Sequence, residues 1–170
     1  MRKLTVKEMA VFSMLGVVMF LSKLVMDALP NIHLLAMFTV AYTLVFRAKA
    51  LYPIYTYVML LGLVYGFQPW WVPHLYLWLI LWAGVMLIPK GLKNHWKLAV
   101  AIVLCALHGL LYGVLYAPMQ ALLYGMNWQG MVAWIVAGFP FDLIHGVGNL
   151  LAGILIAPVA LALKTAKKYL

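Results

Sequence analysis

The chain alternates long apolar runs with short polar connections. The runs cover about residues 5–28, 32–47, 50–67, 72–89, 96–124 and 129–164. Most of them reach the roughly 20 residues that a helix needs to cross the hydrocarbon core of a bilayer. Inside lipid the backbone amides have no water to bond, so a helix is the backbone that satisfies them. The pattern predicts an all-α integral membrane protein, a bundle of six transmembrane helices forming a single domain over residues 1–170. The second run is short and the last two are long, so we expect tilt or kinks, with one kink at Pro140.

The basic residues predict the orientation of these helices. Eleven of the twelve Lys and Arg residues lie in alternate connections: Arg2, Lys3 and Lys7; Arg47 and Lys49; Lys90, Lys93 and Lys97; Lys164, Lys167 and Lys168. The positive-inside rule therefore places both termini in the cytoplasm. Lys23 is the exception, near the outer end of the first helix, where Asp27 follows four residues later and can pair with it. Either a snorkelling ion pair or a pair that faces a ligand accounts for these two residues.

Composition agrees with a membrane protein. Apolar residues make up 68% of the chain, charged residues make up 9%, and the mean hydropathy is +1.04, which excludes an ordinary soluble domain. The net charge of +9 does not indicate a nucleic-acid partner, because the basic residues form separate short clusters between apolar runs. Cys105 is the one cysteine, so no disulfide forms within the chain.

One segment of the last run carries polar groups at membrane depth. Asp142, His145 and Asn149 are offset by three and four residues, so a helix places them on one face. An ionisable residue there is costly, roughly 3 kcal/mol on insertion scales, and is by default a hypothesis of function. We expect this face to form the polar floor of a pocket, with Asp142 holding the other two side chains and tying the last helix to its neighbours.

The outer connections are rich in residues that could bind a small molecule. They contain Asn31 and His33 in the first loop, Trp70, Trp71 and His74 in the second, and Asn127 and Trp128 in the third. Part of this tryptophan content is the aromatic belt that is normal at a bilayer surface.

Two helical stripes go beyond a belt. One aromatic stripe has spacings of three, four and four; the other repeats a hydrogen-bonding group every fourth residue. They comprise Trp71, His74, Trp78 and Trp82, and then His108, Tyr112, Tyr116, Gln120 and Tyr124. Packing between helices explains any one of these residues. Together with Asp142 they predict a mostly apolar cavity with a few directed polar groups, the usual form of a small-molecule site.

Small residues predict close helix contacts. Ala10, Ser13 and Gly16 form a smooth strip on the first helix, and Gly109 and Gly113 form another on the fifth. Most such strips serve internal packing, and at least one could dock a partner membrane protein.

Motifs for energy conversion and catalysis are absent from the sequence. No phosphate-binding Gly-x-x-x-x-Gly-Lys-Ser/Thr loop occurs, so the chain cannot use ATP by itself. No His-Glu-x-x-His or Gly-x-Ser-x-Gly motif occurs either, and catalysis is unsupported. Grouping of His33, His74 and His145 with Asp142 would make a metal site, but no ligand-spaced pair favours one. A chain of this size fits a binding protein that depends on others for energy better than a self-contained carrier.

The stretch Gly138-Phe-Pro-Phe-Asp-Leu-Ile-His-Gly-Val-Gly-Asn149 resembles the sixth-helix segment of the substrate-binding S components of energy-coupling factor (ECF) transporters in prokaryotes. The layout of six helices with cytoplasmic termini is similar over the whole chain. The resemblance implies a vitamin-binding subunit of the cell membrane with no permanently bound cofactor. It also implies a shared membrane coupling subunit and two ATPase subunits as partners, which use the ATP. The family's docking patch on the first helix corresponds here to Ala10, Ser13 and Gly16.

Among vitamin-specific members, the chain looks most like those for cobalamin (vitamin B12). The resemblance implies binding at the outer face, under the loops that join the first helix to the second and the third to the fourth. The residue pattern adds to this site Lys23, Asp27, the outer-loop residues, Trp78, Tyr112, Tyr116 and the Asp142 face. Other ligands stay open, namely a queuosine precursor or folate. Two other classes also stay open: a self-sufficient secondary carrier with Asp142 as its proton site, and an intramembrane enzyme using His145.

Overall fold

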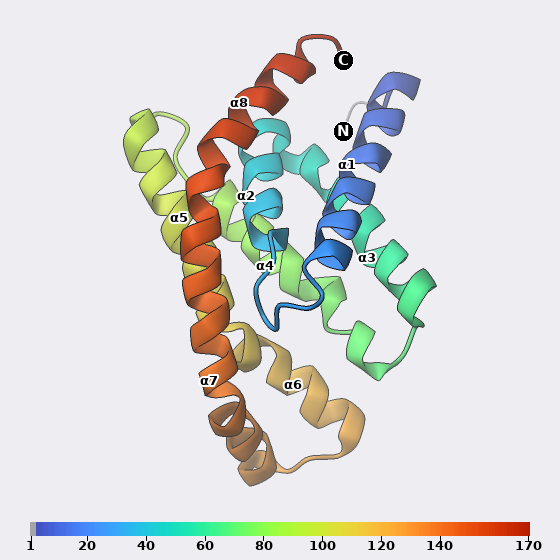
Figure 1. The fold of residues 1–170 in the computed structure, drawn as a ribbon, viewed down its shortest axis with the longest axis vertical. Helices are drawn as coiled ribbons and strands as arrows, with labels where there is room; N and C mark the ends of the chain where they lie inside the picture. Colours follow the sequence, from blue (N-terminus) through green and yellow to red (C-terminus); the bar gives the residue numbers. More distant parts are fainter. Residues whose placement is uncertain (1–2) are drawn as a thin grey trace.

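The computed structural model describes residues 3–170, which form helices joined by short turns and loops (Figure 1). Arg2, counted above with the amino-terminal basic cluster, lies outside the described residues. In chain order the elements are α1 (Val6–Val25), α2 (Leu35–Phe46), the 3-10 helix η1 (Arg47–Ala50), α3 (Leu51–Tyr65), η2 (Pro69–Trp71), α4 (His74–Met86), α5 (Asn94–Leu110), α6 (Tyr112–Tyr124), α7 (Trp128–Ala152), η3 (Gly153–Leu155) and α8 (Ile156–Lys167). The predicted all-α class is confirmed for this part of the chain.

The helices alternate in direction, as the six predicted passes require, when α5 with α6 and α7 with α8 each count as one rod (Figure 1). Contacts at the two ends of α1 and α3 show that these two run parallel. The Lys49 Nζ lies 2.5 Å from the Glu8 Oε1 at one end, and the Tyr65 hydroxyl donates to the Asp27 Oδ2 over 3.0 Å at the other. The intervening α2 runs the opposite way.

A sharp turn at Arg47 reverses the chain between α2 and α3. Arg47 has a φ of 55°, in the left-handed region that favours glycine, and such a backbone costs of order 1–3 kcal/mol. Hydrogen bonds hold the turn in place. The Arg47 guanidinium donates to the Met86 carbonyl over 2.8 Å, and the Trp82 indole N–H donates to the Arg47 carbonyl over 3.2 Å. Trp82 therefore anchors this turn. The predicted aromatic stripe on α4 thus includes at least one residue with a structural role.

Some of the helices are long and apolar enough to cross a membrane, and others are shorter than a usual span. Three helical stretches of the described chain are long and apolar enough to cross a membrane: Val6–Val25, Leu35–Tyr65 and Trp128–Lys167. A fourth qualifies if α5 and α6, bent by 42° at Leu111, are one broken span. Because Leu35–Tyr65 folds back at Arg47, each of its halves is shorter than a usual span, and α4 has only 13 residues. The sequence predicted a short second run but not short third and fourth helices.

α2 occupies the centre of the bundle. Ten of its twelve residues are buried, whereas large apolar side chains on α1 and α7 are exposed. A helix that is apolar all round belongs inside a protein or a bilayer, and α2 is covered by the other helices. The exposed apolar side chains of the outer helices are what a lipid-facing surface requires.

The kinks fall elsewhere than the sequence predicted. α7 passes through Pro140 as one continuous α-helix, and the change to 3-10 geometry comes at η3. The bend between α5 and α6 falls at Leu111, and the preceding helix α5 contains no proline. Its cause is the packing of α7 described below.

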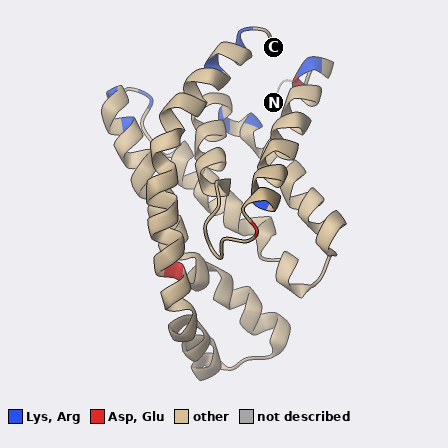
Figure 2. Ribbon diagram, viewed as in Figure 1, with Lys and Arg blue, Asp and Glu red and all other residues tan. Residues whose placement is uncertain are grey.

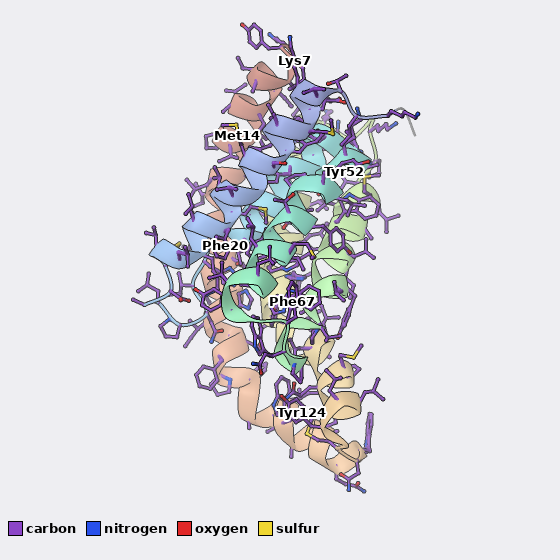
Figure 3. All side chains as sticks on the ribbon, turned by 90° about the vertical axis from the view of Figure 1, so that its right-hand side faces the viewer. Lys7, Met14, Phe20, Tyr52, Phe67 and Tyr124 are labelled. Atoms are coloured by element: carbon purple, nitrogen blue, oxygen red, sulfur yellow. The ribbon has the colours of Figure 1, made fainter. Side chains whose placement is uncertain are left out.

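Charge separates the two ends of the bundle. Apart from Lys23, the described Lys and Arg residues gather at the end that holds both chain termini (Figure 2). At the opposite end, the hairpin of α6 and α7 extends beyond the α3–α4 connection, as shown by Tyr124 and Phe67 (Figure 3). The predicted clustering of basic residues at one end is confirmed; their position relative to a membrane stays a prediction.

Candidate functional site

The polar face of α7 is buried, as its spacing predicted. Asp142, His145 and Asn149 are 7%, 2% and 1% exposed. They lie against α5 and the start of α6. The three polar groups therefore face protein, and their hydrogen-bond partners can be named.

Glycines let α7 approach α5 and α6 closely. A Cβ added at Gly109 would lie 2.7 Å from the His145 carbonyl oxygen, and one at Gly113 would collide with the Asp142 carboxylate. On α7, a Cβ at Gly146 would lie 3.2 Å from the Leu110 Cβ. These small residues serve internal packing, because helices in membranes approach closely where their side chains are small.

Asp142 caps the start of α6. Both carboxylate oxygens accept from the Gly113 N–H, each over 3.1 Å. The first amides of a helix have no partner within it, and a carboxylate there satisfies them and favours the helix dipole. The bend at Leu111 is possible because α7 supplies this cap. Asp142 thus ties the last helix to its neighbour, as expected. It does not hold Asn149, whose amide donates to the Cys105 carbonyl over 3.1 Å.

Five residues from five parts of the chain form what we call the histidine–aromatic cluster. Its centre is the pair His33 and His145, with ring centroids 4.7 Å apart. The Tyr112 ring lies 4.9 Å from the His145 ring, and the Trp78 ring lies 5.4 Å from the His108 ring. The cluster therefore consists of His33 from the α1–α2 loop, Trp78 from α4, His108 from α5, Tyr112 from α6 and His145 from α7.

The cluster holds polar atoms without a hydrogen-bond partner. Within the described chain these buried atoms include Trp78 Nε1, His108 Nδ1 and His145 Nε2. His108 Nε2 lies 3.1 Å from the Leu77 carbonyl, which accepts only, so this nitrogen carries the proton and Nδ1 of the neutral ring is an acceptor. The Trp78 indole N–H is a donor. Buried polar atoms without partners are rare in folded proteins, and here a donor and an acceptor occur on adjacent rings.

A second tier of rings continues the cluster towards the α6–α7 hairpin. The Tyr112 hydroxyl lies 3.3 Å from His74 Nε2, and the His74 ring is 5.7 Å from the Trp70 ring. The Tyr116 hydroxyl donates to the Trp70 carbonyl over 2.7 Å. Predicted residues from both stripes therefore meet, as the sequence suggested.

A groove of about 560 Å³ lies beside α7 and borders the cluster at His33. Its walls are apolar residues of the α1–α2 loop and of α7, such as Ile32, Leu143 and Val147, with His33 among them. A smaller pocket of about 220 Å³ is formed by the end of α1 and the α1–α2 loop and brings together four predicted site residues, Lys23, Asp27, Asn31 and His33. His33 lines both spaces and also contacts His145, so it connects them to the cluster.

Lys23 and Asp27 form an ion pair that a third residue completes. The Lys23 ammonium bonds the Asp27 Oδ1, Tyr65 donates to the Oδ2, and Lys23 also lies 4.9 Å from the centre of the Tyr65 ring. The hydrogen bonds from Lys23 and from Tyr65 lower the pKa of Asp27 below its ordinary value. This exposed contact fastens the end of α1 to the end of α3, beside the smaller pocket.

Three predicted binding residues lie away from the cluster. Trp71 donates its indole N–H to the Val58 carbonyl over 2.8 Å and so anchors η2 to α3. Asn127 caps α7 by accepting from the Gly130 N–H over 2.8 Å. Trp128 is 70% exposed at the tip of the α6–α7 hairpin. Each has a local structural role or lies outside the cluster, so we do not place them in the site.

The predicted docking strip is divided by the fold. Ala10 and Ser13 are exposed on α1. Gly16 is buried against α3, where an added Cβ would lie 2.5 Å from the Thr56 Cβ and 2.8 Å from the Pro53 carbonyl oxygen. Within this chain the missing side chain of Gly16 is used by α3, which leaves Ala10 and Ser13 as the exposed part of the strip; its docking role stays a prediction.

The grouping of His33, His74 and His145 with Asp142 is also not seen as a ligand set. In the part of the chain that the structure describes, no three His, Cys, Asp or Glu side chains are arranged to hold a metal ion. The Asp142 oxygens face the Gly113 amide instead.

Sequence reasoning missed several contributors to the site. Tyr57 is buried with its ring 5.9 Å from Trp78, and Trp134 stacks on Tyr116 at 5.8 Å. Tyr65 bonds Asp27 across 38 positions of sequence. His108 was recognisable as the start of the stripe on the fifth helix, but the others are ordinary aromatic residues in apolar runs and carry no local signal.

Comparison with known proteins does not add a relationship. No family model, no curated protein and no solved structure matches this chain.

Proposed function

We propose that this chain is an integral membrane protein that binds a small ring-containing molecule and acts as the S component of an ECF vitamin importer. Membrane insertion is supported by exposed apolar side chains on the outer helices and by basic residues gathered at one end. In the proposed orientation that end is cytoplasmic and the histidine–aromatic cluster lies in the outer half of the bundle.

The observation that carries the binding proposal is the set of unpartnered nitrogens in the histidine–aromatic cluster. Trp78 Nε1 and His108 Nδ1 supply one donor and one acceptor, and the buried Trp78 ring and the half-buried Tyr112 ring would stack on a ligand that enters the cluster. A conjugated ring with both kinds of polar group at its edge complements this arrangement. Vitamins and their precursors include such rings.

The size of the groove bears on the choice of vitamin. Its volume of about 560 Å³ lies in the range of small-molecule sites, roughly 300–1,000 Å³. A deazapurine precursor of queuosine or the pterin of folate is of a size for this groove, where it would contact His33. To reach the buried Trp78 ring and the half-buried Tyr112 ring, it must part the cluster at His33. Cobalamin, the ligand implied by the sequence resemblance, is considerably larger and requires the α1–α2 loop to move away from α7.

Tryptophan fluorescence of the purified protein tests ligand binding. We expect saturable quenching with one of cobalamin, folate or a queuosine precursor, because Trp78 lies in the cluster. His145→Gln should weaken that response by about tenfold, the effect of losing one well-placed hydrogen bond. His95→Gln, an exposed histidine at the basic end, is the matched control and should not change it. The absence of a saturable response to all three compounds would refute the vitamin-binding proposal.

Dependence on partners is tested by transport. We expect uptake in cells only when the membrane coupling subunit and the two ATPases are produced with this chain, since the sequence has no nucleotide site. Uptake without those subunits, driven by a pH gradient, would favour the self-sufficient carrier. The hydrogen bonds of both Asp142 oxygens to the Gly113 amide do not favour that alternative.

A further inference from the structure

A second pocket lies among the basic residues, at the end of the molecule opposite the α6–α7 hairpin. It has a volume of about 460 Å³ and opens between the start of α1, the α2–α3 turn and the end of α8. Its lining residues include three cations, one carboxylate and two aromatic rings: Arg47, Lys49, Lys167, Glu8, Phe12 and Phe46. The pocket therefore carries an excess of positive charge beside an apolar wall.

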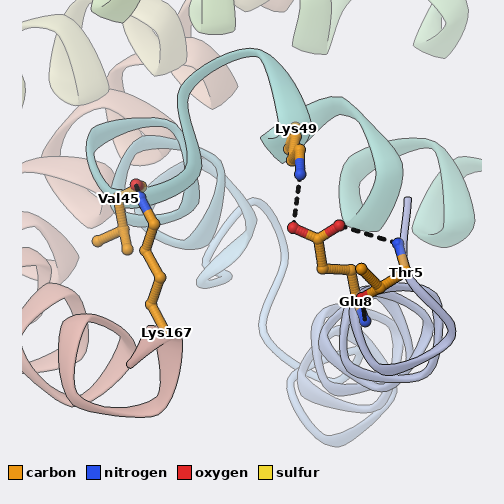
Figure 4. A network of polar contacts seen from close by, with 5 residues as sticks. All are labelled: Thr5, Glu8, Val45, Lys49 and Lys167. Carbon is orange, nitrogen blue, oxygen red and sulfur yellow. Dashed lines mark hydrogen bonds and ion pairs between the residues drawn. The ribbon is translucent and has the colours of Figure 1, made fainter. Parts of the chain in front are cut away.

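Each of the three cations makes a contact within the protein and still has N–H donors that this contact does not use. Arg47 donates to the Met86 carbonyl, and Lys167 donates to the Val45 carbonyl, each over 2.8 Å. Lys49 pairs with Glu8, which also accepts from the Thr5 N–H over 3.1 Å. Figure 4 shows the Lys167 contact apart from the contacts of Lys49, Glu8 and Thr5. An ammonium has three donors and a guanidinium has five, so these bonds leave donors for an anion that enters between the elements.

The carboxylate of Glu8 does not cancel this preference. It is 15% exposed and engaged with Lys49 and with the amide of its own helix start, where it completes a capping box. Of the three lining cations, Lys49 is the one that Glu8 pairs with. Arg47 and Lys167 bond neutral carbonyls and keep their full charge.

The apolar wall distinguishes a lipid from a soluble anion. The rings of Phe12 and Phe46 pack edge to face at 5.1 Å, and the Lys167 ammonium lies 5.9 Å from the centre of the Phe46 ring. Beyond the pocket, Val6 and Met9 of α1 are exposed, at 77% and 47%. A phosphate among the cations would thus have apolar surface beside it, as the glycerol and acyl chains of a lipid require.

From this juxtaposition we propose that the pocket binds the phosphate of an anionic phospholipid. The phosphate lies among Arg47, Lys49 and Lys167, and the acyl chains follow the apolar side of α1. The binding needs no vitamin at the histidine–aromatic cluster, so this inference stands independently of the proposed function.

Native mass spectrometry of the detergent-purified protein tests the inference, with phosphatidylglycerol and phosphatidylcholine added in turn. We expect the protein to retain phosphatidylglycerol and to bind phosphatidylcholine more weakly, because only the first has a net negative headgroup. The double substitution Lys49→Gln with Lys167→Gln should weaken phosphatidylglycerol binding by roughly thirtyfold, given the contribution of each of the two lysines near a lipid surface. The matched control, Lys7→Gln with Lys168→Gln, removes the same charge at the same end from residues outside the pocket.

Three results would overturn the inference. Equal loss in both double variants would mean attraction to net charge rather than binding in the pocket. Equal retention of both lipids would remove the role of the anionic headgroup. Displacement of phosphatidylglycerol by millimolar inorganic phosphate would assign the pocket to a soluble phosphate compound. Because the lysine substitutions could weaken folding, Glu8→Gln provides a test in the opposite direction: its amide can still cap α1, and phosphatidylglycerol binding should tighten.

Discussion

The buried carboxylate of Asp142 has a structural role, because it accepts hydrogen bonds from the backbone of another helix. Its two oxygens satisfy an amide that the bend at Leu111 would otherwise leave unpaired. We predict that Asp142→Ala lowers the free energy of unfolding by about 1–3 kcal/mol, since it leaves a buried donor unsatisfied. Asp142→Asn, which keeps an accepting oxygen, should cost less. Thermal unfolding in detergent measures both, and a larger loss for Asn than for Ala would contradict the capping role.

Two histidines of the cluster should respond differently to loss of their nitrogens. Among residues 3–170, no group bonds His145 Nε2, whereas His108 donates to the Leu77 carbonyl. We predict that His108→Phe destabilises the protein by about 1 kcal/mol and that His145→Phe leaves its stability nearly unchanged. The same unfolding measurement compares them. A loss at His145 as large as that at His108 would show that His145 is a structural residue, and would weaken the binding proposal.

The ion pair of Asp27 predicts a flat pH response. Because Lys23 and Tyr65 lower the Asp27 pKa below its ordinary 3.8, the carboxylate stays ionised at any pH above that value. Its contribution to stability is fully present there and is lost only as the pH falls through the lowered pKa. Hydrogen exchange of the α1–α2 loop should therefore not show a titration of this contact between about pH 5 and 8. Asp27→Asn should speed exchange in the loop throughout that range, and a titration step in the wild type there would contradict the assignment.

At the scale of helices, α1 presents two surfaces with different tasks. Gly16 packs against α3, and Ser13 is exposed one turn earlier. We predict that Gly16→Leu destabilises the isolated protein by about 1–3 kcal/mol or more through overpacking, whereas Ser13→Leu leaves its stability unchanged. If α1 docks a coupling subunit, Ser13→Leu should reduce co-purification with that subunit. Equal effects of the two substitutions on stability would contradict the division of the helix.

Periodicity predicted the helices well because each apolar run ends at polar or proline-containing connections. It could not locate the breaks within them. Pro140 suggested a kink, but α7 continues through it, and the bend falls at Leu111 because a carboxylate from another helix caps the new start. Breaks that depend on a partner 29 residues away leave no local pattern.

The histidine–aromatic cluster was predictable only in part, because periodicity shows which residues share a helix face but not which helices meet. Spacing of three and four residues placed Asp142 with His145, and His108 with Tyr112, on common faces. It could not show which helices meet. The approach of His33 to His145, and the bond of Tyr65 to Asp27, depend on how the α1–α2 loop crosses α7 and α3. Asn127 and Trp128 carried the same residue types as the site but lie at the tip of the hairpin.

For the whole molecule, the arrangement of basic residues makes topology testable. We predict that a single cysteine at Lys168, in a Cys105→Ser background, is inaccessible to a membrane-impermeant thiol reagent in intact cells, whereas one at Trp128 is labelled. Both positions are exposed in the structure, so burial does not explain a difference. Labelling at Lys168 but not at Trp128 would reverse the proposed orientation, and labelling of both or of neither would contradict the placement of these two positions on opposite sides.

The contact between Gly113 and Asp142 also bears on the order in which the protein can be made. Synthesis runs from the amino terminus, so the Gly113 amide emerges 29 residues before the carboxylate that satisfies it. Until α7 has followed, the bend at Leu111 lacks its cap, and α5 and α6 have no reason to hold their final angle. A chain stopped before Asp142 should therefore expose the start of α6 to proteases and quality-control machinery. The angle between α5 and α6 is therefore fixed only once α7 is complete, the same helix that places His145 in the cluster.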